Sequence, residues 1–131
     1  MKVGLDTSVV LRLLLGQPTD QSQRAVAFLE AVTRRGDQAV VSDLVVAEAY
    51  FALQHHYEVP KNEALVALRR MFADGEIESQ GVATEVLAME GLASAKPGFV
   101  DRLIQGAYIS NGGSMATFEK TSGKLKSVRV L

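Results

Sequence analysis

Four acidic residues occupy positions from which a folded chain could bring them together. They are Asp6, Glu48, Asp101 and Glu119. Two of them directly follow short apolar runs typical of strands, and two stand among apolar neighbours three and four residues away, as on one face of a helix. Carboxylates gathered in one place repel one another and stay ionised at neutral pH only beside a strong positive charge. The pattern predicts a site for a divalent cation.

The available side chains indicate which cation this would be. The chain has no cysteine, and its two histidines, His55 and His56, are adjacent, so on a helix they diverge and do not form a metal pair. Oxygen ligands favour Mg²⁺ or Mn²⁺ over Zn²⁺, with waters completing the shell. A water activated there can attack a phosphodiester. The chemistry expected is therefore Mg²⁺- or Mn²⁺-dependent hydrolysis of phosphodiester bonds.

Three of the acids also have structural explanations. Asp6 could cap the helix that follows it. Asp101 could stabilise a helix dipole from the first helical turn. Glu119 could end a strand and face solvent beside Lys120 and Lys124. These alternatives stay open for each acid taken alone.

Glu48 is expected to lie on an apolar helix face. Its neighbours three and four residues away are Leu44, Val45, Phe51 and Ala52. An ionised, unpaired carboxylate on a buried face costs several kcal/mol, so Glu48 would need a cation, hydrogen-bond donors or a raised pKa. A salt bridge to an arginine is the structural alternative to a metal.

Length and composition favour one compact domain over residues 1–131. The 47% hydrophobic content suffices for one core. The chain has 14 Lys and Arg against 15 Asp and Glu, and this near-neutral charge neither indicates nor excludes a nucleic-acid partner. The longest apolar stretch near the N-terminus is broken by Asp6 and Arg12 and lacks a cleavage pattern. We expect a cytoplasmic protein with no membrane partner.

Short apolar runs alternate with longer helical patterns along the chain. Strands are expected at 2–5, 38–41, 114–118 and 128–131, with a weak edge strand at 76–79. Helices are expected at 8–15, from Thr19 or Asp20 to Gly36, after Ser42, from Pro60 to Gly75, at 83–94 and at 99–110. This order predicts a three-layer α/β/α fold around a mostly parallel sheet of about five short strands. Asp6 would then lie at the carboxyl end of a central strand, where sheets of this kind bind their ligands.

Four segments, in this order, carry a family pattern: LDTSVVLRLLLGQPTDQ, SDLVVAEAYFAL, GFVDRLIQGAY and MATFEK. Together they resemble the PIN domain family and, within it, the VapC-type toxin ribonucleases of type II toxin–antitoxin systems. The resemblance covers nearly the whole chain and implies a PIN-like fold and a metal-dependent endoribonuclease. It also implies a homodimer and a cognate antitoxin that holds the enzyme inactive.

The same resemblance assigns roles to residues. Asp6, Glu48, Asp101 and Glu119 would be the catalytic and metal-binding acids, with Glu48 and Glu119 reaching the metal directly or through a water. Ser8, two residues after the first acid, and Thr117 would support them. Glu119 stands where the family usually has Asp, which makes a catalytically weak or inactive PIN-fold module that binds RNA or protein the alternative function.

Two arginines, Arg12 and Arg102, lie near proposed acids and could contact RNA phosphate or an antitoxin, the alternative being ordinary solvated charges.

A signalling or phosphatase domain of this architecture would have a second acid beside Asp6 or two residues after it. Thr7 and Ser8 stand at these positions, which counts against that function class.

Apolar surface is the remaining expectation. The helix over 64–72 and the stretch containing Tyr50, Phe51 and Tyr57 are expected to carry more apolar side chains than one small domain can bury. This surplus predicts a homodimer.

Overall fold

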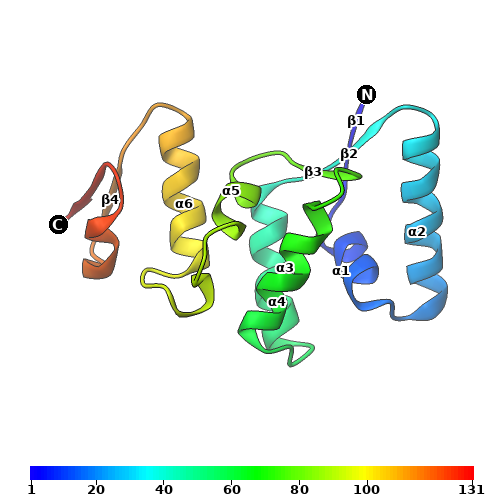
Figure 1. Cartoon of the computed structure of the whole chain (residues 1–131), viewed down its shortest axis with the longest axis horizontal. Coiled ribbons are helices and arrows are strands. Elements are labelled where there is room, and N and C mark those ends of the chain that lie inside the picture. The colour runs from blue at the N-terminus through cyan, green and yellow to red at the C-terminus, as the bar shows by residue number, and fades with distance from the viewer. The chain divides into compact units, whose positions relative to one another are not determined.

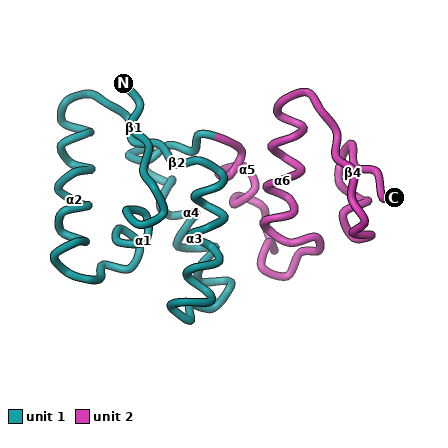
Figure 2. The backbone as a smooth tube through the Cα atoms, turned by 180° about the vertical axis from the view of Figure 1, so that it is seen from behind, with its two compact units in different colours: residues 1–80 teal, residues 81–131 magenta.

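Three short parallel strands form the sheet of the first of two compact units. The computed structural model describes all residues 1–131 and divides into Met1–Gln80 and Gly81–Leu131 (Figure 2). The strands of the first unit are β1 (Lys2–Gly4), β2 (Gln38–Val41) and β3 (Ile77–Ser79), in the order β1-β2-β3. Ala39 is in register with Val3 on one side and with Ile77 on the other. The buried, Val-rich strand β2 is therefore the central one.

Four helices complete the first unit (Figure 1): α1 (Thr7–Leu15), α2 (Thr19–Arg34), α3 (Asp43–His55) and α4 (Lys61–Phe72). Helix α1 packs against both α2 and α3, and α3 packs against α4. The largest fully buried side chains of this unit are Val10, Val32, Val41, Val46, Leu53 and Leu68. This core fixes α1 between two neighbours, and α1 carries the first candidate site residues.

Local signals explain where α1 and α3 begin and end. Asp6 caps α1, and the Ser42 hydroxyl caps α3 by accepting a 3.3 Å hydrogen bond from the Val45 amide. Gly16, at φ 70°, ends α1 in the left-handed conformation that glycine adopts without strain, and its amide donates to the Arg12 carbonyl at 3.0 Å.

The second unit contains two helices and a pair of strands. Its elements are α5 (Ala83–Leu87), the short 3-10 helix η1 (Leu92–Ser94), α6 (Phe99–Ser110), β4 (Met115–Thr117), the 3-10 helix η2 (Lys120–Lys124) and β5 (Val128–Val130). Strands β4 and β5 pair in parallel, with Ala116 opposite Arg129. Helix α5 packs against α6, and η2 packs against β5. Glu119 therefore lies in the crossover between the two strands.

The parallel α/β architecture with five short strands is confirmed, but the strands divide into a sheet of three and a pair. The expectation that Asp6 follows a central strand is wrong for this sheet, because β1 is its edge strand and β2 its centre. No helix combines the length and apolarity needed to cross a membrane.

Two expectations about helix bounds are also corrected. Helix α2 begins directly after Pro18, which offers no side-chain cap, and not after a cap at Thr19 or Asp20. The helix expected over 83–94 is two elements: α5 ends at Leu87, and the 3-10 helix η1 begins after Gly91, whose left-handed φ of 73° separates it from a continuous helix.

The expected apolar surface is only partly exposed. Ala64, Leu65, Leu68 and Phe72 of α4 are buried, so these four side chains are not available to a partner. Tyr50 is buried as well. In α4, Leu65, Leu68 and Phe72 follow one another at three and four residues, the spacing of a core-facing stripe. Sequence alone does not distinguish such a stripe from an interface.

Candidate active site at the head of α1

Asp6 stands at the junction of β1 and α1 and is exposed. Its Oδ1 accepts a 2.7 Å hydrogen bond from the Ser8 hydroxyl and a 3.1 Å bond from the Val9 amide. These two donors, the hydroxyl first, hold the pKa of Asp6 below its ordinary value because they stabilise the carboxylate. Both bonds fall on Oδ1, so neither engages Oδ2. Asp6 therefore caps the helix and still presents a carboxylate oxygen to an external ligand.

Glu48 is linked to this acid through the next residue along the chain. The Thr7 hydroxyl donates a 2.8 Å hydrogen bond to Glu48 Oε1 across the α1–α3 contact. Because Thr7 directly follows Asp6, the bond brings the Glu48 carboxylate beside the head of α1. The structure thus places two of the four predicted acids around one helix end.

The expectation that Glu48 lies on a buried face is wrong. Glu48 is exposed, and its face neighbours Leu44 and Phe51 are 71% and 46% exposed. The buried stripe of α3 consists of Val46, Ala49, Tyr50 and Leu53, which follow the i, i+3, i+4, i+7 spacing on another side of the helix. Glu48 therefore needs no buried counter-ion.

The other two predicted acids belong to the second unit. Asp101 lies in the first turn of α6 and is exposed. Glu119 is exposed directly before η2, and its amide donates a 3.0 Å hydrogen bond to the Thr117 hydroxyl. Thr117 thus holds the backbone of Glu119. Arg102, the other predicted contact residue of this unit, donates a 2.8 Å hydrogen bond from Nε to the Pro97 carbonyl.

The candidate metal ligands of the first unit are carboxylate oxygens, the type of donor that a hard cation prefers. Neither unit gathers three or more His, Asp or Glu side chains around one point, so the first unit offers a pair of carboxylates, Asp6 and Glu48. Mg²⁺ commonly binds proteins through one or two carboxylates and takes its other ligands from water and substrate phosphates. Asp6 and Glu48 fit that role and would hold the ion.

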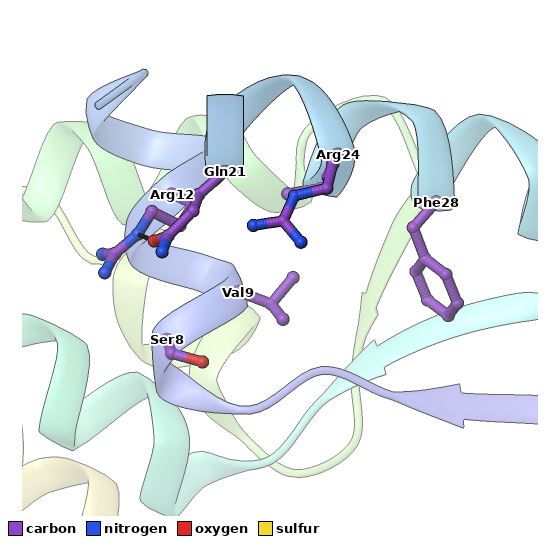
Figure 3. A pocket seen from close by; sticks show the side chains of 7 residues that line it. Ser8, Val9, Arg12, Gln21, Arg24 and Phe28 are labelled. Carbon is purple, nitrogen blue, oxygen red and sulfur yellow. Dashed lines mark hydrogen bonds between the residues drawn. The ribbon is translucent and has the colours of Figure 1, made fainter. Parts of the chain in front are cut away.

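A pocket of about 260 Å³ opens between α1 and α2 next to Asp6 (Figure 3). Ser8, which hydrogen-bonds Asp6, lines it together with Arg12, Arg24 and the half-exposed ring of Phe28. Arg12 Nε donates to Gln21 Oε1 at 2.5 Å, which joins the two helices at the pocket. Arg12 was predicted from the sequence and shares this pocket with Ser8, whereas Arg24 and Phe28 were not predicted.

A second pocket, of about 410 Å³, opens between α1 and α3 beside Thr7, the residue that follows Asp6. Thr7 and Glu48 line it with Phe51, His55 and His56. The Phe51 and His55 rings stack with centroids 6.2 Å apart and an interplanar angle of 19°. In the sequence Phe28 and Phe51 give no signal of this role, since exposed and buried phenylalanines look alike in an apolar helical pattern.

A family model described as PIN domain matches residues 3–126. No curated protein matches the chain. The family match spans both compact units and includes all four predicted acids. The chain therefore belongs to the PIN domain family.

Proposed function

We propose that the protein is a Mg²⁺- or Mn²⁺-dependent endoribonuclease of the VapC toxin type. PIN domains are generally nucleases and typically use divalent metal ions, so family membership supports hydrolysis of phosphodiester bonds. The observation that carries the proposal is the pairing of Asp6 with Glu48 through Thr7, next to a pocket with two arginines. Carboxylates can hold a cation that activates water, and arginines can bind phosphate, so this arrangement suits phosphodiester hydrolysis.

Each residue has a role in this proposal. Asp6 and Glu48 hold the cation, which when bound neutralises charge on the phosphate and lowers the pKa of water. Ser8 orients the Asp6 carboxylate, and Thr7 orients that of Glu48. Asp101 and Glu119, which belong to the second unit, are the two further acids that the family resemblance names.

Partners are also proposed by analogy with VapC toxins. A homodimer and a cognate antitoxin would cover apolar side chains that the isolated chain leaves exposed. Leu44 and Tyr57 form part of that exposed set, at 71% and 45% exposure. Light scattering that shows a monomer at high micromolar concentration would contradict the dimer.

The test is RNA cleavage with Mg²⁺ or Mn²⁺, with EDTA, and with the Asp6→Asn variant. Cleavage should need the ion and should fall at least 100-fold in the variant, since mutating a metal ligand removes the charge that the ion requires. Glu30→Gln, an exposed carboxylate on α2, is the matched control and should cleave normally. Undiminished cleavage in EDTA would refute the metal mechanism.

A PIN-fold module that binds RNA without cutting it is the second candidate. Glu119, one methylene longer than the Asp expected at that position, favours it, because direct Mg²⁺ ligands tolerate little displacement. RNA that binds in Mn²⁺ and stays intact would favour this candidate over the nuclease.

A further inference from the structure

We infer that single-stranded RNA crosses the head of α1 with one nucleotide seated in each of the two pockets that flank Asp6. The inference rests on the proposed function for the identity of the strand as RNA, and it adds where the strand lies and which side chains hold it. All the residues involved belong to Met1–Gln80.

The α1–α2 pocket combines positive charge with an exposed aromatic ring. Arg12 and Arg24 both line it, and Phe28, 43% exposed, closes one side (Figure 3). Arg12 spends Nε on Gln21, which fixes the guanidinium and leaves its terminal nitrogens for another acceptor. Arg24 has only a 3.8 Å exposed pair with Asp20, which solvent screens. A phosphate and a stacked base together match this lining.

The α1–α3 pocket repeats the aromatic part without the arginines. Phe51 is half-exposed and stacks with His55, so the two rings form one platform beside Glu48. Aromatic side chains hold bases of any sequence, because every base has a π-face. This pocket would take a base rather than a phosphate, since its lining contains no arginine or lysine.

Continuity between the pockets follows from the sequence at the head of α1. Ser8 lines the first pocket and Thr7 the second, and these are the two residues that follow Asp6 in the chain. A strand that uses both pockets must therefore pass Asp6, which is where the scissile phosphate has to be. Half-exposed rings select unpaired nucleotides, because duplex pairing hides base faces in the stack.

Fluorescence anisotropy measures the binding directly. The probe is a labelled single-stranded RNA of about ten nucleotides, in EDTA so that it stays uncut. Phe28→Leu and Phe51→Leu should each weaken binding about 5- to 150-fold, the range for one lost base stack. Phe28→Tyr and Phe51→Tyr keep a ring and should bind like the wild type. The same RNA annealed to its complement should bind more weakly than the single strand.

The arginines are tested by salt dependence. Arg12→Gln and Arg24→Gln should each reduce affinity and lower the slope of log affinity against log salt by about 0.7, the value for one phosphate contact on a single strand. Arg34→Gln, an exposed arginine in the last turn of α2 outside both pockets, is the matched control and should keep the wild-type slope.

The outcomes separate this inference from the proposed function. If RNA is cut but both leucine variants bind it like the wild type, the strand lies elsewhere and the inference fails while the nuclease stands. If the variants lose RNA affinity but the wild type never cuts, the path is right and the nuclease is wrong. If the two pockets instead serve a protein partner, the two leucine variants and the two glutamine variants at Arg12 and Arg24 would all bind RNA like the wild type. That result would overturn the inference.

Discussion

The Thr7 hydroxyl lies 2.8 Å from Glu48 Oε1 and donates a hydrogen bond to it, so the residue that follows the first acid orients the second. Thr7→Val keeps the shape of the side chain and removes the donor. We expect Mn²⁺ affinity to fall about 10- to 100-fold, the usual effect of losing a group that orients a metal ligand. Calorimetry checks this, with Thr7→Ser, which keeps the hydroxyl, as the control that should bind Mn²⁺ normally.

Asp6 has two separable roles, as a helix cap and as an ionised ligand. Asp6→Asn should keep the cap, because Asn is as good an N-cap as Asp, while Asp6→Ala should lower the free energy of unfolding by about 0.5–2 kcal/mol. Both variants should lose RNA cleavage. Urea denaturation without metal distinguishes them, and equal stabilities for the two would show that the cap contributes nothing.

Acid pH should remove the contribution of the Ser8–Asp6 bond. The pKa of Asp6 is lowered in the folded chain, chiefly by the Ser8 hydroxyl. A carboxyl with a lowered folded pKa stabilises the fold above its unfolded pKa of about 3.9, and loses that contribution as pH falls through the folded value. Ser8→Ala should therefore raise the pKa of Asp6 and destabilise the metal-free protein at pH 7 more than in acid. Carboxyl NMR titration reads the pKa, and an unchanged value in the variant would contradict the assignment.

Glu119 is tested by shortening it and by neutralising it. If it supports the ion through a water, Glu119→Asp should keep or raise Mn²⁺ affinity, and Glu119→Gln should weaken it about 10- to 100-fold. The hydrogen bond from the Glu119 backbone amide to the Thr117 hydroxyl uses no atom of the Glu119 side chain and should survive both changes. Equal Mn²⁺ affinities for the wild type and the Gln variant would remove Glu119 from the site.

Sequence patterns predicted elements well where chemistry marks their ends. The helix at 99–110 and the strand at 38–41 have the expected bounds, and Gly16 and Ser42 act as the expected cap residues. Helix α3 was harder, because it is apolar on nearly every side and its sequence does not say which stripe faces the core. That ambiguity led to the wrong expectation of a buried Glu48.

The site was predictable in its residue types and not in its surroundings. Asp6 and Ser8 are neighbours in sequence, so their bond follows from a capping pattern. The Thr7–Glu48 bond and the pocket that joins Arg12 to Phe28 depend on how α1 packs against α3 and α2. Such packing brings together residues distant in sequence, and no local spacing encodes it.

The half-exposed rings of Phe28 and Phe51 have a practical consequence for handling the protein. Sulfate and phosphate salts are excluded from protein surfaces and strengthen the burial of apolar groups, so they should drive these rings against another molecule. Contacts with nucleic acid weaken as ionic strength rises. High sulfate should therefore strip RNA from the purified protein and promote its self-association, whereas dilute chloride buffer should keep molecules apart and retain bound RNA.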